Sequence, residues 1–148
     1  MIPTRPFTIA LRTLLATATA LPVGPGHAPD GPPPYYLLHF IDRQTHGAPI
    51  SDLNEDCTLV YQVDSVSGPD PRRPDSHGTQ DQMEWLADKA REAILGRDPA
   101  TGLWLHPLTV PGIKVMGRAP GAEAGGTPDA ADGIMSSSSR YVFELTSV

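Results

Sequence analysis

The chain has 148 residues and a mass of 15.8 kDa, which corresponds to a single domain over residues 1–148. Its 17 acidic residues outnumber its 11 Lys and Arg, and the net charge of −6 argues against binding nucleic acid through its phosphates. The single cysteine, Cys57, excludes an intramolecular disulfide, and the lack of a long apolar run predicts no membrane-spanning segment and no membrane partner.

Residues 5–28 allow two interpretations. Apolar residues recur there at spacings of three and four, which predicts an amphipathic helix that begins after Pro6: Phe7, Leu11, Leu14, Ala18 and Leu21. The alternative is a cleaved signal peptide, because Arg5 precedes an apolar run that contains small residues. Arg12 lies inside that run and favours the helix.

Two strands are expected next, on either side of a polar connection. The Pro/Gly-rich residues 24–34 are predicted to be a flexible linker, and the aromatic-rich residues 35–42 to form a strand. Residues 58–66 alternate in polarity, as does a half-buried strand of an antiparallel sheet. The inward-facing residues of this second strand are expected to be Leu59, Tyr61 and Val63.

The second helix carries the clearest start and stop signals. Thr79 can cap its N-terminus, Gln82 completes a capping box three residues later, and Gly96 can end the helix. At 100° per residue one face is apolar: Met83, Leu86, Ala87, Ala90, Ala93 and Ile94. The opposite, charged face carries Trp85.

The C-terminal part is predicted to hold two strands joined by a flexible segment. Residues 113–116 are expected to form a short strand, and residues 117–139 are a low-complexity run of Gly, Ala, Ser and Pro that we expect to be flexible. Residues 140–146 alternate again and predict a final strand. Its inward-facing residues are expected to be Tyr141, Phe143 and Leu145.

Together these elements predict an α+β domain. Paired strands in succession favour an antiparallel or mixed four-stranded sheet, with the two helices packed on one face. The uncovered face is then expected to present polar side chains: Gln62, Asp64, Arg140 and Glu144.

The sequence offers no catalytic, metal or cofactor motif. Cys57 has no second cysteine at zinc-ligand spacing, the five histidines are scattered, and no glycine-rich phosphate loop occurs. The acidic group Asp52, Glu55 and Asp56 lacks the pattern of a calcium loop and is interpreted as a solvated turn. We therefore predict a protein that is not an enzyme, with no cofactor and no bound metal.

Trp85 is the residue that most suggests an interface. It either packs beneath residues 97–108 or belongs to a contact surface, because tryptophan is enriched at binding hot spots. The interface hypothesis combines the polar face of the second helix with the uncovered face of the sheet: Trp85, Leu95, Glu92, Gln62 and Asp64.

Residues 58–96 resemble the tail terminator, or tail completion, proteins of long-tailed bacteriophages. The resemblance rests on the strand TLVYQVDSVSG, a loop rich in Pro, Arg and Asp, and the helix DQMEWLADKAREAILG. In that family a strand of the type QVDS precedes a helix rich in Ala, Asp and Arg. An N-terminal helix, a first strand pair and a C-terminal strand complete the unit.

The resemblance implies a structural protein of the virion, located at the tail or neck and assembled in the host cytoplasm. Such proteins form a ring, commonly a hexamer, that caps the finished tail tube, stops its polymerisation and receives the head-side connector. The implied partners are further copies of the chain, the tail tube protein and the connector protein. DNA would pass through the ring without specific binding, which suits a negatively charged chain.

Three other interpretations stay open. The chain could be another neck protein of the head–tail connector, or a secreted binding protein from which residues 1–28 are removed. The third is a small enzyme that uses Cys57 or the acidic group.

Overall fold

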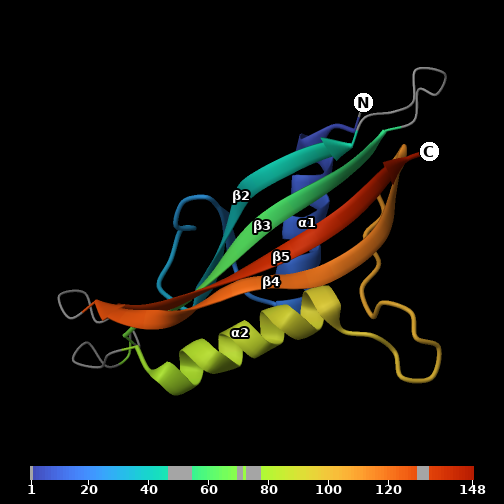
Figure 1. The fold of residues 1–148 in the computed structure, drawn as a ribbon. Helices are drawn as coiled ribbons and strands as arrows, with labels where there is room; N and C mark the ends of the chain where they lie inside the picture. The colour runs from blue at the N-terminus through green and yellow to red at the C-terminus, as the bar shows by residue number, and fades with distance from the viewer. Residues whose placement is uncertain (1, 47–54, 70–71, 73–77, 130–133) are drawn as a thin grey trace.

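The computed structural model describes residues 2–46, 55–69, 72, 78–129 and 134–148. These residues form two helices and one five-stranded sheet (Figure 1). In chain order the elements are α1 (Thr4–Thr19), β1 (Val23–Pro25), β2 (Tyr35–His46), β3 (Asp56–Ser67), α2 (Gln80–Leu95), β4 (Ile113–Asp129) and β5 (Ile134–Ser147). The α+β class is confirmed.

The sheet is mixed and has the strand order β1-β2-β3-β5-β4. β1 pairs parallel with β2, and the other neighbours pair antiparallel. The prediction of four strands is wrong because Val23–Pro25, which overlaps the start of the linker predicted at residues 24–34, forms a fifth strand. Pro25 is tolerated there because β1 is an edge strand. Gly24 is required, because a Cβ at that position would collide with the carbonyl oxygen of His27.

Helix α1 begins at Thr4, earlier than predicted. Pro6 is tolerated in the first turn, where a backbone N–H has no acceptor within the helix. Phe7 is fully buried, with its ring 5.8 Å from that of Tyr61 and 5.2 Å from that of Phe143. The prediction of an amphipathic helix is confirmed, because Thr4–Thr19 is helical and its apolar residues form part of the core.

Strands β2 and β3 pair along their whole lengths and extend beyond the residues predicted for them. The register shifts between Phe40 and Asp42, so Ile41 is a bulge. The inward orientation predicted for Leu59, Tyr61 and Val63 is confirmed, because all three are buried.

The largest difference from expectation is the C-terminal hairpin. Most of residues 117–139, expected to be a flexible segment, belongs to β4 and β5, while residues 130–133 lie outside the described residues. The small side chains of this run have little strand propensity of their own. Strand formation depends on the neighbouring strand instead, because β5 pairs with β3 from Ser67↔Met135 to Asp56↔Thr146.

Helix α2 begins and ends where the sequence predicts. The Thr79 hydroxyl accepts a hydrogen bond from the Gln82 amide at 3.1 Å, and Gly96 follows the last helical residue. The Gln82 side chain reaches the Thr79 amide through the Ser67 hydroxyl, where a standard capping box has a direct hydrogen bond. The Ser67 hydroxyl accepts from the Thr79 amide at 3.2 Å and donates to Gln82 Oε1 at 2.5 Å, which ties the helix start to the end of β3.

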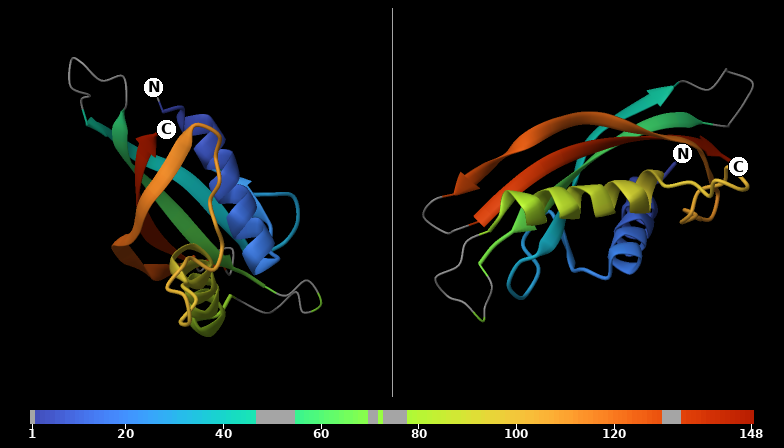
Figure 2. Two further views of the ribbon diagram at one scale, coloured as in Figure 1. Left: turned by 90° about the vertical axis from the view of Figure 1, so that its right-hand side faces the viewer. Right: turned by 90° about the horizontal axis from the view of Figure 1, so that it is seen from below.

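Both helices pack on the same face of the twisted sheet, as the two views in Figure 2 show, so this part of the prediction is confirmed. The core lies between the two layers. Tyr36 is fully buried there and its hydroxyl donates to the carbonyl of Leu86 in α2 at 2.6 Å. The largest other side chains that are fully buried are Tyr61, Tyr141, Phe7, Phe143, Ile2 and Leu11.

Candidate interaction surfaces

Trp85 lies on the outer face of α2, and 51% of its surface is exposed. The expectation that it packs beneath residues 97–108 is wrong, since half of the residue is open to solvent. Lys89 is a charged neighbour, whose ammonium lies 4.5 Å from the ring centre. A half-exposed indole over a well-packed helix has apolar area available for a partner.

Acidic side chains frame Trp85 along the helix. At positions i, i+4, i+7 and i+11 one exposed stripe of α2 reads Asp81, Trp85, Asp88 and Glu92. We call these four residues the α2 stripe. The stripe therefore has an apolar residue between negative charges. Glu92 lies on the same exposed face of α2 as Trp85, as the sequence predicts.

Leu95 does not belong to this surface. It is half-buried and packs against the core, in the last turn of α2 beside the buried Ile94. Leu95 lies about 80° around the helix from Trp85. Its side chain therefore faces the core rather than the exposed face of α2. The structure thus places Leu95 apart from the two exposed interface candidates of α2.

Gln62 and Asp64 lie on the opposite, uncovered face of the sheet, where they join a polar network across β2, β3 and β5. Asp64 is the centre of this network. Its Oδ1 accepts from Ser138 Oγ at 2.6 Å and from Gln62 Nε2 at 2.9 Å, and its Oδ2 lies 2.9 Å from His39 Nε2. Arg140 Nε donates to Gln62 Oε1 at 3.3 Å.

The order of groups in this network differs from that of a hydrolytic triad. Ser138 and His39 both bond to the carboxylate of Asp64, whereas a serine nucleophile needs the imidazole as its direct neighbour. Asp64 is thus the shared partner of Ser138, Gln62 and His39. The arrangement cross-links three strands and holds these side chains in fixed positions.

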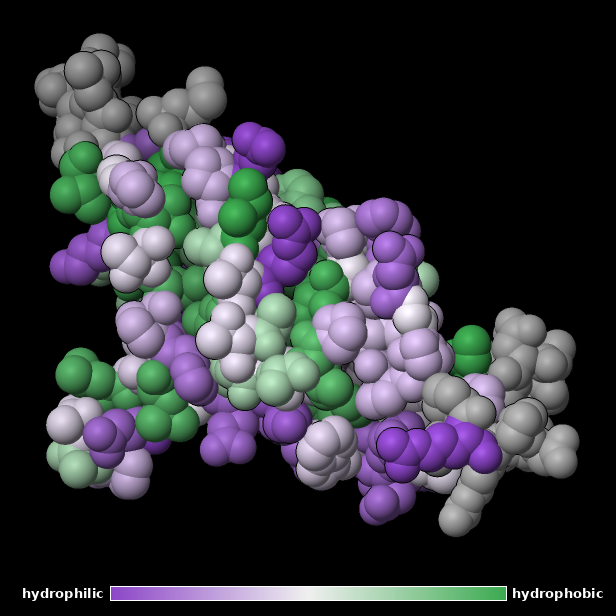
Figure 3. All heavy atoms as spheres, turned by 180° about the vertical axis from the view of Figure 1, so that it is seen from behind, coloured by the Kyte–Doolittle hydropathy of each residue, from purple (hydrophilic) through white to green (hydrophobic). Residues whose placement is uncertain are grey.

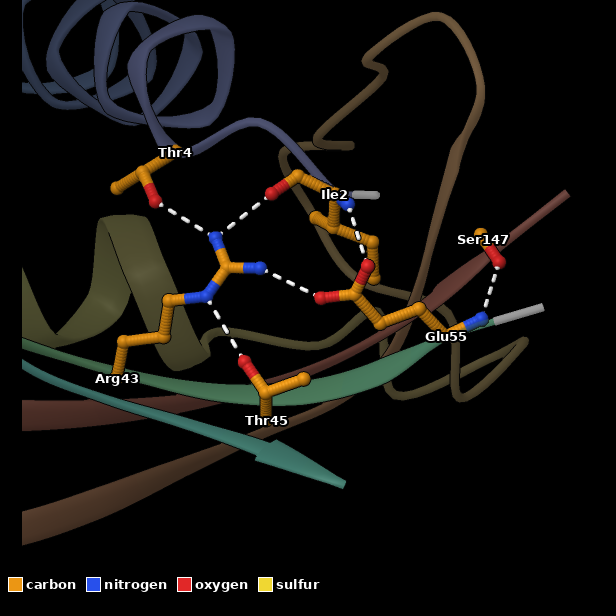
Figure 4. A network of polar contacts seen from close by, with 6 residues as sticks. All are labelled: Ile2, Thr4, Arg43, Thr45, Glu55 and Ser147. Carbon is orange, nitrogen blue, oxygen red and sulfur yellow. Dashed lines mark hydrogen bonds and ion pairs between the residues drawn. The ribbon is translucent and has the colours of Figure 1, made fainter. Parts of the chain in front are cut away.

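A second network joins the chain ends to the sheet (Figure 4). Arg43 donates from NH1 to the carbonyl of Ile2 at 2.7 Å and from NH2 to Glu55 Oε1 at 2.7 Å, and Glu55 Oε2 accepts from the Ile2 amide at 3.1 Å. The Glu55 amide donates to Ser147 Oγ at 2.7 Å. Burial by itself raises the pKa of Glu55, but the hydrogen bonds from Arg43 and Ile2 outweigh it and lower the pKa.

The solvated turn predicted for Asp52, Glu55 and Asp56 needs correction. Asp52 lies outside the described residues, Glu55 is bonded to Arg43, and Asp56 begins β3. Cys57 is buried in β3, and burial is the main reason that its thiol pKa is raised. A raised pKa keeps the thiol protonated, the opposite of what a cysteine nucleophile needs.

The role of Arg118 is not apparent from the sequence. This residue of β4 is 8% exposed and donates to the carbonyl of Ile94 at 3.0 Å and of His106 at 2.9 Å. Its guanidinium lies 4.7 Å from the Trp104 ring, which Arg97 approaches to 4.0 Å. Because Arg118 is an isolated arginine in a low-complexity segment, neither its burial nor its two carbonyl partners could be predicted from the sequence.

Comparisons with protein-family models and with curated proteins found no match. Neither helix of the described residues combines the length and apolar character that crossing a membrane requires. Within the described ranges, His, Cys, Asp and Glu form no group of three or more that could hold a metal ion.

Proposed function

We propose that the protein is a structural component of a bacteriophage virion that forms a ring at the end of the tail tube. The ring would stop polymerisation of the tube and present the docking surface for the head-side connector. The observation that carries the proposal is the α2 stripe. It combines a half-exposed tryptophan with a framework of acidic side chains, on a helix whose other face is buried.

Burial of the α2 stripe against another copy of the chain would provide a favourable free energy of association. Burying the exposed half of an aromatic side chain that presents about 150–250 Å² contributes about 2–3 kcal/mol at ~25 cal/mol/Å². In a closed ring the same contact occurs between every pair of neighbouring subunits. The small free energy of each contact therefore adds up around the ring. The resemblance of residues 58–96 to tail terminator proteins connects this capacity with the tail.

The charge of the chain fits a ring around a DNA channel. The net charge of the chain is −6. A negative lining repels the phosphate backbone and lets DNA pass without specific contacts. The proposed partners are therefore other copies of the chain, the tail tube protein and the connector protein.

Electron microscopy of particles assembled without this protein tests the proposal. Tails that continue well beyond their normal length and carry no heads are the expected result, because nothing caps the growing tube. Tails of normal length without heads would contradict the terminator role and favour another neck protein. Complete particles with normal tails would overturn both versions.

A further inference from the structure

An apolar groove lies on the helix side of the molecule, where α1 crosses the outer edge of β2. The groove has a volume of about 590 Å³, and Ile9 and Phe40 line it together with Thr8. Phe40 is 47% exposed and Ile9 40% exposed, although the Phe40 ring also lies 5.5 Å from the buried Tyr61 ring. Figure 3 shows this face as apolar side chains set among polar ones.

The groove is open because β1 is short. β1 pairs with β2 only as far as Pro25↔Leu38, so in the described part of the chain the outer edge of β2 beyond Leu38 has no strand partner. The bulge at Ile41 distorts this edge, which disfavours the addition of another strand. The site therefore suits a helix laid across it better than an added strand.

Two arginines flank the groove. Arg5, Ile9 and Arg12 occupy positions i, i+4 and i+7 of α1 and line the same groove. Within the described residues, neither Arg5 nor Arg12 forms an ion pair or a side-chain hydrogen bond, whereas the third arginine of the groove, Arg43, is held by Glu55. Two positive charges are thus available on either side of an apolar centre.

This pattern is the counterpart of the α2 stripe. Asp81, Trp85 and Asp88 also occupy positions i, i+4 and i+7, with an apolar residue between two charges. At 1.5 Å per residue both charge pairs span about 10.5 Å along their helix axes. The two surfaces therefore match in spacing, in the position of the apolar residue and in the sign of charge.

We propose that the α2 stripe of one copy docks in the α1–β2 groove of the next copy. Trp85 would cover Ile9 and Phe40, while Asp81 and Asp88 would pair with Arg5 and Arg12. This inference rests on the proposed ring and identifies its interface.

The placement of the two surfaces supports a second copy as the occupant. α2 packs beneath β3, β5 and β4, whereas the groove lies at the β2 side of the sheet (Figures 1 and 2). A chain with two different, complementary surfaces on separate sides associates head to tail, and a rotation that closes gives a ring. Charge pairs at the rim then select the register, and the tryptophan supplies the contact area.

Charge-reversed variants test the interface. Arg5→Glu with Arg12→Glu makes the groove acidic, and Asp81→Arg with Asp88→Arg makes the stripe basic. Each variant alone is expected to remain monomeric in light scattering, because like charges meet at every contact. An equimolar mixture is expected to assemble, because each groove then meets a stripe of opposite charge.

Controls separate misfolding and general charge effects from loss of the interface. Circular dichroism must show native helix content and a cooperative thermal transition for each variant. Lys114→Glu, a charge reversal at an exposed residue outside both surfaces, changes the net charge by half as much as the groove variant and is expected to assemble normally. Trp85→Ala is expected to weaken association about 30-fold or more, as a hot-spot residue does.

The outcomes distinguish this proposal from the function on which it rests. If the unaltered chain forms a ring and both charge-reversed variants do so equally well, the interface is wrong while the ring stands. If the variants form rings but no longer bind tail tubes, the proposed contact between copies is also wrong. The altered surfaces then bind the tail tube protein rather than a second copy. An unaltered chain that stays monomeric at every concentration overturns the ring and the interface together.

Discussion

Replacing Arg118 by methionine is expected to lower the free energy of unfolding by about 2–4 kcal/mol. The guanidinium donates to two carbonyls, of Ile94 at the end of α2 and of His106, and also lies over Trp104. Burial, with the nearby charge of Arg97, lowers the Arg118 pKa to about 10, so the side chain is charged at neutral pH.

The magnitude follows from the contacts that methionine cannot replace. Hydrogen bonds from a charged donor contribute about 1.5–3 kcal/mol each, which gives roughly 3–6 kcal/mol for the two. Methionine fills a similar volume and removes the cost of burying the charge, so the expected loss lies below that sum, at about 2–4 kcal/mol. The carbonyl oxygens of Ile94 and His106 are left without this donor.

Urea unfolding followed by far-UV circular dichroism at neutral pH measures the effect. Lys114→Met is the matched control, because Lys114 is an exposed cation of the same strand and a surface substitution changes stability by about 0.5 kcal/mol or less. If Arg118→Met were as stable as the parent within about 0.5 kcal/mol, the reasoning that this arginine anchors the end of α2 would be refuted.

Three further predictions concern the core and the chain ends. Phe7→Ala removes the ring that packs on Tyr61 and Phe143 and should cost about 3–5 kcal/mol in urea unfolding, whereas a loss below 1 kcal/mol would show that α1 does not support the core. Tyr36→Phe removes the hydrogen bond to the Leu86 carbonyl and should cost about 1 kcal/mol, and an unchanged midpoint would contradict that bond. Because the folded-state pKa of Glu55 lies below its unfolded value, its contribution is complete above the unfolded pKa of about 4.3 and is lost as the pH falls through the folded pKa. Glu55→Gln should therefore flatten the acid side of the stability profile measured by thermal unfolding, and identical profiles would contradict the network in Figure 4.

Local signals were sufficient for α2 and for the inward-facing residues of β3. Thr79 and Gly96 act through neighbouring backbone groups, and alternation along a strand follows directly from its geometry. These predictions succeeded because the interactions that decide them lie within a few residues.

The features that escaped prediction depend on distant partners. Most of the segment 117–139 forms strands because β5 pairs with β3, more than sixty residues earlier in the chain. Arg118 is buried because the end of α2 offers it carbonyl acceptors. The groove at Phe40 exists because β1 ends at Pro25 and leaves the edge of β2 uncovered there. The length of a neighbouring strand cannot be predicted from the composition around Phe40.

The absolute mass of the purified full-length protein, measured by light scattering on a sizing column over a concentration series, decides whether the chain assembles into a ring. A ring of six chains is expected to give a discrete particle close to six times the 15.8 kDa chain mass, which dissociates when Trp85 is replaced by alanine. A monomer at every concentration, with native circular dichroism, would contradict the claim that this domain assembles into a ring.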